Sequence, residues 1–267
     1  MMAESNPTAS RSAGSNSSGL NSYQNLFRLD DRKAVVIGAG SGIGRESALA
    51  LAAHGAEVVC ADRDLAAAEE TTGLGDRLSA RELDVLDQSA IGQAAADLGA
   101  VDVLVFTAAT NVRKRLLDYS SEEFDRVLSL NLRSAFDLVR AFGPGMAERG
   151  SGSVIGFSSI RALTVEPGQG VYAATKAGLL QLMRTAAAEL GPQGVRFNVI
   201  APGVVETPLT SQIRDVPQWY DAYASKSALG RWAKPEELAG AVVYLASDAS
   251  SYVSGTFIAV DGGWLAR

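Results

Sequence analysis

Tyr172 and Lys176 stand four residues apart, and Ser159 precedes the tyrosine by thirteen positions. Residues separated by four lie on the same face of a helix, so the lysine ammonium can lie beside the phenol. A phenol exchanges protons poorly near neutral pH because its pKa is about 10, and a neighbouring cation lowers that pKa. The pattern therefore predicts a site of proton transfer in which Tyr172 is the proton carrier.

A glycine-rich turn near the other end of the chain strengthens this interpretation. It follows the strand-like run at 33–37, precedes a predicted helix, and reads Gly38-Ala39-Gly40-Ser41-Gly42-Ile43-Gly44. Glycines let the backbone approach a pyrophosphate, and the free N–H groups at a helix N-terminus stabilise its charge. We therefore expect a dinucleotide to bind at this turn.

The type of dinucleotide is predicted from Asp62, which ends the second predicted strand. A carboxylate there can accept hydrogen bonds from both hydroxyls of an adenine ribose, and it repels a 2′-phosphate. Arg45 and Arg63 lie close by in the sequence and keep NADP as the alternative, but we expect NAD. Asp84 and Val85 follow the third predicted strand and are expected beside the adenine, although Asp84 also reads as a solvated loop residue.

The composition argues against several other classes of function. The formal net charge of −6 argues against nucleic acid as a partner, since binding phosphates requires a surplus of Lys and Arg. No apolar run approaches the length of a membrane span, and no cluster of His, Cys, Asp or Glu suggests a metal site. Because Cys60 is the only cysteine, no intrachain disulfide can form, and we expect a cytoplasmic protein.

The chain of 267 residues contains no internal linker, so we expect one dinucleotide-binding catalytic domain at 23–267. Residues 1–22 are rich in Ser, Asn, Ala and Gly and carry few large apolar side chains. Such a segment cannot bury enough surface to offset its ordering entropy, so we expect a disordered tail. A targeting peptide is the alternative interpretation of this segment.

Short strand-like runs alternate with helical patterns, which predicts an α/β protein with a doubly wound Rossmann fold and helices on both faces of a parallel sheet. Seven strands are predicted at 33–37, 57–61, 78–83, 101–106, 153–157, 195–200 and 256–259. Helices are predicted at 42–54, 64–71, 87–97, 121–147, 170–190 and 235–246. Ser120 and Glu123 form a predicted capping box before the fourth of these helices.

These motifs resemble, in their order, those of the short-chain dehydrogenase/reductase family. The resemblance covers about 30 to 265 and rests on Gly38-x-x-x-Gly42-x-Gly44, Asn131, Ser159, Tyr172-x-x-x-Lys176, Pro202-Gly203 and Asp261-Gly262-Gly263. It implies that Tyr172 donates or accepts the proton and that Ser159 orients the substrate oxygen. It also implies that Lys176 binds the nicotinamide ribose and lowers the tyrosine pKa, and that Asn131 anchors a water relay.

The resemblance further implies a set of cofactor contacts and a quaternary structure. The implied contacts are Gly38, Ser41, Gly42, Ile43, Gly44, Ala108, Pro202, Gly203, Val205 and Thr207, the last beside the nicotinamide carboxamide. The family commonly pairs the helices at 121–147 and 170–190 across subunits, so a homotetramer is expected. From the residues alone, Asn131 also reads as a hydrogen-bonded core amide, and Lys176 as a side chain that extends to the surface.

One motif departs from the family pattern. The chain has Phe106-Thr107-Ala108-Ala109 where the family usually has Asn-Asn-Ala-Gly. The methyl group of Ala109 stands where the backbone packs against the adenosine, so we expect a slightly displaced or more weakly bound cofactor. The missing first Asn also removes a hydrogen-bonding side chain.

Three loops at the carboxyl ends of the strands are expected to select the substrate. They contain Arg113 in the run 111–115, Arg161 shortly after Ser159, and Trp219 in 208–229, where the family has a lid. The run Asn-Val-Arg-Lys resembles that of gluconate 5-dehydrogenases, which favours a sugar acid or polyol bound through Arg and Asn. A solvated basic loop is the alternative interpretation.

The sequence thus predicts an NAD-dependent oxidoreductase that transfers a hydride between nicotinamide and a secondary alcohol or ketone. One alternative is an NADPH-dependent 3-oxoacyl carrier-protein reductase, against which Asp62 and the acidic net charge argue. A second alternative is a non-catalytic nucleotide-sensing protein. The complete set of Asn131, Ser159, Tyr172 and Lys176 argues against it.

Overall fold

The computed structural model describes residues 22–267. The predicted tail at 1–22 lies outside these residues except for its last position, which belongs to a helical turn at 22–25. Within the described residues, seven strands form one parallel sheet in the order β3-β2-β1-β4-β5-β6-β7. The strands are β1 (Lys33–Ile37), β2 (Glu57–Asp62), β3 (Leu78–Glu82), β4 (Val103–Phe106), β5 (Gly152–Phe157), β6 (Val195–Pro202) and β7 (Phe257–Val260). The predicted doubly wound Rossmann fold is confirmed.

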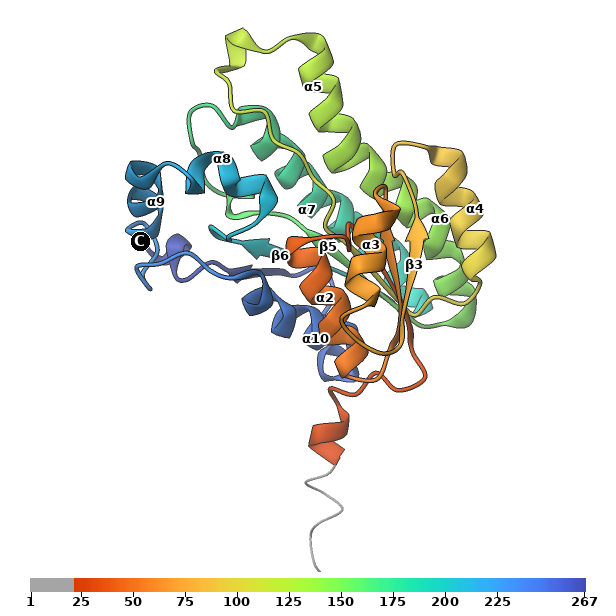
Figure 1. Cartoon of the computed structure of the whole chain (residues 1–267). Coiled ribbons are helices and arrows are strands. Elements are labelled where there is room, and N and C mark those ends of the chain that lie inside the picture. Colours follow the sequence, from red (N-terminus) through yellow and green to blue (C-terminus); the bar gives the residue numbers. More distant parts are fainter. Residues whose placement is uncertain (1–21) are drawn as a thin grey trace, which may run out of the picture.

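Helices cover both faces of this sheet (Figure 1). Alternate side chains of a strand point to opposite faces, so each central strand contributes to two cores. On one face, Val35 and Ile37 pack in a core with α4, α6 and α7; on the other, Ala34 and Val36 pack in a core with α2, α3 and α10. These helices are α2 (Gly42–Ala53), α3 (Leu65–Thr72), α4 (Gln88–Leu98), α6 (Ser134–Arg149), α7 (Gly170–Leu190) and α10 (Ala239–Ala246).

The predicted helix at 121–147 is not a single α-helix. It consists of α5 (Ser121–Leu128), a π-helical segment at Ser129–Arg133, and then α6. The predicted capping box of Ser120 and Glu123 is present at the start of α5. A π-helical turn inserts one residue into the helix and redirects the side chains around it, which changes where Asn131 points. Likewise, the predicted helix at 235–246 begins as a 3₁₀ turn at Pro235–Leu238.

The predicted lid at 208–229 contains two short helices, α8 (Ser211–Arg214) and α9 (Pro217–Ala224). α9 lies beside the C-terminal end of the chain (Figure 1). Arg267 donates hydrogen bonds to the Ser225 and Ser227 carbonyls, and the Tyr223 and Trp264 rings lie 5.9 Å apart. This segment therefore packs on the C-terminal residues. No helix within 22–267 is both long enough and apolar enough to cross a membrane.

Candidate active site

A cavity of about 530 Å³ lies where the strand order reverses, between the carboxyl ends of β1 and β4. This is the position at which open parallel sheets bind nucleotides. Its walls contain every predicted cofactor contact, namely Gly38, Ser41, Gly42, Ile43, Gly44, Asp62, Asp84, Val85, Ala108, Tyr172, Lys176, Pro202, Gly203, Val205 and Thr207. Ser159 lines the same cavity, and further walls come from residues that the sequence analysis did not indicate, including Arg126 and Leu130.

The glycine turn folds tightly because several of its positions favour or require glycine. Gly38 and Gly42 have φ angles of +83° and +53°, in the left-handed region that favours glycine. A Cβ atom on Gly44 would lie 2.0 Å from the Gly38 carbonyl oxygen, which excludes any side chain there. Helix α2 begins in this turn, and the first N–H groups of a helix have no partners within it. These groups can bind the phosphate oxygens of a dinucleotide.

Asp62 is fixed at the wall of the cavity by the backbone around it. Its Oδ2 accepts a hydrogen bond of 2.9 Å from the Gly40 N–H, and its Oδ1 accepts one of 3.1 Å from the Asp64 N–H. Each oxygen keeps a second acceptor position, which a ribose hydroxyl can fill. Arg45, in contrast, is committed to the glycine turn: it donates to the Gly40 carbonyl at 2.5 Å and to Thr71 Oγ1 at 3.0 Å.

Ser159 and Tyr172 both line the cavity, with the Ser159 hydroxyl near enough to affect the pKa of the phenol. Burial raises the pKa of Tyr172 to about 12, and the Ser159 hydroxyl and the charge of Arg161 offset part of this rise. The lowering of this pKa that we expected from Lys176 is therefore not found in the protein alone. The lysine Nζ lies 5.5 Å from the centre of the tyrosine ring, and desolvation of the phenol dominates.

Lys176 is only 3% exposed, so it does not extend to the surface. Its Nζ donates a hydrogen bond of 2.8 Å to the Phe157 carbonyl at the end of β5. Burial lowers the pKa of Lys176 to about 8, because the ammonium loses its hydration. The side chain is thus a cavity-lining amine that can change its protonation state near neutral pH.

Asn131 does not line the cavity. Its side-chain amide accepts a hydrogen bond from the Thr110 N–H and donates one to the Thr110 carbonyl, both at 2.8 Å. A further bond of 3.2 Å reaches Thr175 Oγ1 on α7. Asn131 therefore has the bonds of a core amide, and it fixes the loop after β4, whose residues Ala108 to Thr110 line the cavity.

The unusual run Phe106-Thr107-Ala108-Ala109 is accommodated by specific contacts. Phe106 lies opposite Gly156 in the sheet, and a Cβ atom on that glycine would lie 2.9 Å from the Phe106 ring. The ring thus fills the space that Gly156 leaves. Thr107 donates from Oγ1 to the Ile37 carbonyl at 3.0 Å, so this residue supplies a side-chain hydrogen bond to the strand that precedes the glycine turn. Ala109 lines the cavity.

Comparisons with known proteins agree with this geometry. A family model described as Enoyl-(Acyl carrier protein) reductase matches residues 38–265. The chain is 38% identical to a galactitol 2-dehydrogenase (L-tagatose-forming) of Cereibacter sphaeroides, over 91% of this chain and 98% of that protein. It is 34% identical to a 3-oxoacyl-[acyl-carrier-protein] reductase of Thermotoga maritima, over 89% and 99%.

Among solved structures, a gluconate 5-dehydrogenase from Burkholderia cenocepacia in complex with NADP and tartrate matches with a TM-score of 0.88 at 31% identity. The match covers 92% of this chain and 99% of that one. The chain belongs to the short-chain dehydrogenase/reductase family. As a member of this family it is an oxidoreductase that acts on CH–OH groups with a nicotinamide cofactor. Within residues 22–267, no group of three His, Cys, Asp or Glu side chains could hold a metal ion.

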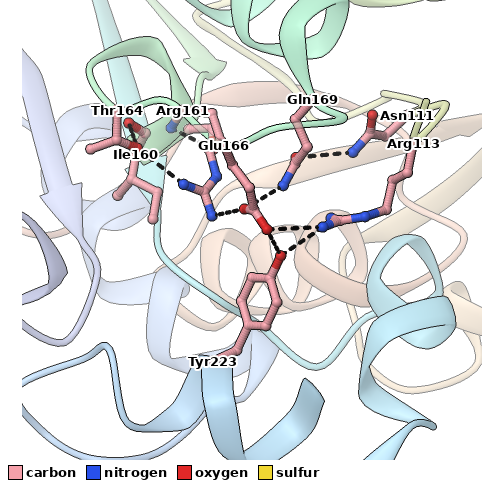
Figure 2. Close-up of polar contacts among 9 residues, drawn as sticks. Asn111, Arg113, Ile160, Arg161, Thr164, Glu166, Gln169 and Tyr223 are labelled. Atoms are coloured by element: carbon pink, nitrogen blue, oxygen red, sulfur yellow. Dashed lines mark hydrogen bonds and ion pairs between the residues drawn. The ribbon is translucent and has the colours of Figure 1, made fainter. Parts of the chain in front are cut away.

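The residues expected to bind the substrate in this short-chain dehydrogenase/reductase lie together but do not line the cavity. Arg113 and Arg161 both contact Glu166 (Figure 2). The Arg113 guanidinium also lies 5.9 Å from the centre of the Trp219 ring. The expectation that the two arginines are free for a substrate is therefore not what the structure shows. Glu166 was missed by the sequence analysis, because nothing in its local sequence indicates partners that lie 53 and 57 positions away.

Proposed function

We propose that this protein is an NAD-dependent dehydrogenase whose substrate is a polyol or a sugar acid. The observation that carries the proposal is that one cavity is lined by the glycine turn, by Asp62, and by the pair Ser159 and Tyr172. The first two suit a dinucleotide, and the pair suits an oxygen that gains or loses a proton. The galactitol dehydrogenase similarity supports the substrate class.

The chemistry is divided between the cofactor and the side chains. When bound, nicotinamide supplies or accepts the hydride. Ser159 and Tyr172 are proposed to hold the reacting oxygen through their hydroxyls, and Tyr172 Oη to give or take the proton. With its pKa raised to about 12, Tyr172 is protonated at neutral pH and is ready to donate to a carbonyl oxygen. In the oxidation of an alcohol, Tyr172 must first lose its own proton so that it can accept the proton of the substrate hydroxyl. Lys176, with a pKa of about 8, is the neighbouring group suited to take up the tyrosine proton.

NAD is proposed over NADP because Asp62 presents negative charge where a 2′-phosphate would lie, while Arg45 is engaged with the glycine turn. NADH should bind at least about tenfold more tightly than NADPH. Fluorescence titration of both cofactors measures this difference. The NADP in the similar gluconate 5-dehydrogenase structure supports the other choice, and a preference for NADPH would therefore reverse the proposal.

A matched pair of variants isolates the charge of Asp62. Asp62→Asn keeps an oxygen for the Gly40 N–H but removes the charge, so the preference for NADH should shrink. Asp84 also lines the cavity, and its Oδ1 accepts a backbone hydrogen bond from Leu86. Asp84→Asn should leave the ratio of the two affinities unchanged. If both variants change the ratio equally, Asp62 does not select the cofactor.

The reaction class and substrate are tested by a turnover screen of polyols, sugar acids and 3-oxoacyl thioesters with both nicotinamides. Turnover of polyols or sugar acids supports the proposal. Turnover of acyl thioesters alone would favour a carrier-protein reductase, the function named for the Thermotoga maritima relative. Absence of turnover on every substrate, with cofactor binding intact, would favour a nucleotide-sensing role.

We also propose a cytoplasmic location. Cys60 is buried on β2 and is the only cysteine, so the fold does not depend on an oxidising compartment. Fractionation of cells that produce the tagged protein measures this directly. Recovery of the protein mainly from a membrane or organelle fraction would contradict the location.

A further inference from the structure

Glu166 binds donors on four residues, Arg113, Arg161, Gln169 and Tyr223, which come from three segments of the chain (Figure 2). Its Oε1 accepts from Arg113 Nη2 at 3.1 Å and from the Tyr223 hydroxyl of the lid. Its Oε2 accepts from Gln169 Nε2 at 2.7 Å and pairs with Arg161 Nη2. A carboxylate has about four lone-pair positions, and all four are used here. Glu166 therefore has no acceptor position left for a substrate.

The guanidinium groups of Arg113 and Arg161 are likewise engaged by other groups of the protein. The Arg161 side chain is 8% exposed; its guanidinium lies 5.4 Å from the centre of the Trp264 ring, and Nη1 donates to Thr164 Oγ1. The Arg113 side chain is 19% exposed, and its guanidinium lies over the Trp219 and Tyr223 rings. Because Glu166 and aromatic rings surround both groups, a substrate carboxylate would have to displace Glu166 to form a bidentate pair with either of them.

Glu166 stays ionised in this arrangement. Burial alone would raise the pKa of Glu166, but the hydrogen bond from Tyr223 and the charges of Arg161, Arg113 and Lys226 outweigh burial and lower it. An ionised carboxylate only accepts hydrogen bonds, so it fixes the direction of the amide that contacts it. Gln169 must turn its NH₂ group toward Glu166 and its oxygen toward Asn111.

The orientation of the Gln169 amide in turn fixes the orientation of the Asn111 amide. Its Nδ2 donates to the Gln169 oxygen at 3.1 Å, which leaves Oδ1 as the free end of the amide. Among residues 22–267, Asn111 Oδ1 is the buried side-chain oxygen or nitrogen without a hydrogen-bond partner. An unpaired acceptor is stabilised by a donor such as a hydroxyl, whereas an ionised carboxylate offers no donor and repels it.

Three members of this cluster connect it to the reacting pair, although their side chains do not line the cavity. The Arg161 N–H donates to Ser159 Oγ at 3.1 Å, Gln169 lies three residues before Tyr172, and Asn111 follows the cavity-lining Thr110. We propose that Glu166 is a specificity-determining residue, an internal counter-ion for Arg113 and Arg161 that makes the site take an uncharged polyol in preference to the sugar acid of the same carbon skeleton. This inference rests on the proposed function and narrows its substrate class.

The test compares matched alditols and aldonates, with galactitol and galactonate, and glucitol and gluconate, as probes. For the wild-type protein, kcat/KM for the alditol should exceed that for the aldonate by about tenfold or more. Glu166→Gln leaves two guanidinium groups without a counter-ion, so the ratio should move by about tenfold or more toward the aldonate. A substitution that only loosened the structure would lower both rates together and leave the ratio unchanged.

Two further variants complete the experiment. Asp97→Asn is the matched control, because the Asp97 carboxylate on α4 also binds an arginine, at 2.7 Å, and a glutamine, at 2.6 Å, but does not line the cavity. It should leave the ratio unchanged. Asn111→Ala removes the free acceptor and should lower kcat/KM for the alditol more than for the aldonate. This variant decides the question if Glu166→Gln does not fold, as judged by its melting temperature.

The outcomes separate the two proposals. If the wild-type protein turns over neither alditols nor aldonates, the proposed substrate class is wrong and this inference is wrong with it. If it turns over both but prefers the aldonate, or if neither Glu166→Gln nor Asn111→Ala moves the ratio, the proposed function stands and the role of Glu166 is rejected.

Discussion

Burial shifts the pKa values of Tyr172 and Lys176 in opposite directions, because it favours the neutral form of each. The phenol keeps its proton more strongly and the amine keeps its proton less strongly. Between these two values, at about 8 and about 12, both groups of the protein alone are neutral. The phenol is then the group with a proton to donate, which is the state that reduction of a carbonyl requires.

Replacing Tyr172 with Phe tests this role directly. The variant keeps the ring but loses the transferable proton, so kcat should fall by about a hundredfold or more. Folding and NADH binding should be retained, as measured by thermal melting and fluorescence titration. A rate close to that of the wild type would show that Tyr172 is not the proton carrier.

Lys176 should make stability depend on pH in an identifiable window. Its pKa is lowered from 10.5 to about 8 in the folded chain, so below about pH 8 the buried charge opposes folding. Between these two values the folded chain releases the proton that the unfolded chain keeps, and this penalty disappears as pH rises. The shift corresponds to about 3 kcal/mol.

The measurement is urea unfolding of the wild type and of Lys176→Met between pH 7.5 and 10.5. The wild type should gain stability relative to the variant as pH rises. Subtracting the variant removes the contributions of Tyr172 and Cys60, whose raised pKa values act in the opposite sense. A difference that stays constant with pH would contradict the lowered pKa of Lys176.

At the residue scale, what the sequence could predict depended on spacing along the chain. The glycine turn and the Tyr172–Lys176 pair are local patterns, and the cofactor contacts predicted from them do line one cavity. The predicted Asn131, Arg113, Arg161 and Trp219 do not line it. The Glu166 contacts could not be predicted, because Arg113, Glu166 and Tyr223 meet only through the tertiary fold. The prediction that the pKa of Tyr172 is lowered was wrong for the protein alone, where this pKa is raised. Sequence spacing shows the neighbouring cation but not the extent of desolvation.

Among the elements, the π-helical segment at Ser129–Arg133 has the clearest consequence. It brings the side chain of Asn131 onto the backbone of Thr110, and so connects α5 and α6 to the loop after β4. Asn131→Ala leaves the Thr110 N–H and carbonyl without these partners, which should cost about 1–3 kcal/mol of stability. It should also lower turnover, because residues of the released loop line the cavity.

Asn198 provides the control for this prediction. It is a buried amide on β6 that likewise bridges backbone groups, donating to the Val253 carbonyl at 2.9 Å and accepting from the Thr256 N–H at 3.1 Å, but it does not line the cavity. Asn198→Ala should lose comparable stability with a smaller effect on kcat. If both variants lose equal stability and lower kcat equally, Asn131 contributes to the fold but has no specific role in positioning the active site.

The elements themselves were predicted well where hydrophobic patterns are long. The helix at 170–190 and the strand at 33–37 were predicted with the observed bounds. The π-helical segment was not predicted, because the apolar positions of 121–147 fit a continuous α-helix within the tolerance of the pattern. β4 begins at Val103, two residues after the predicted start, since Val101 is apolar but precedes the first paired residue.

For the whole molecule, we expect a homotetramer. The surface of α5 and α6 carries Phe124 and Phe136, which are 44% and 40% exposed, and two exposed aromatic rings on adjoining helices suit a contact with another subunit. Light scattering at micromolar concentration should give about four times the 27.8 kDa mass of one chain. A monomer mass would contradict the assembly.

A pair of surface variants tests which face forms this contact. Phe136→Asp introduces a charge on α6 and should yield smaller species. Leu74→Asp changes an equally apolar side chain, 60% exposed and located after α3, and should keep the tetramer. If the two variants have the same mass as the wild type, the contact does not involve Phe136.

The buried thiol of Cys60 can be used to measure how often the sheet opens. The thiol is fully buried on β2, between Val36 of β1 and Ala80 of β3, and burial raises its pKa to about 11. A thiol reagent reacts with the thiolate, so it can modify the chain only when the middle of the sheet opens. The rate of labelling of native protein therefore reports the frequency of that opening, in every variant, without any engineered probe.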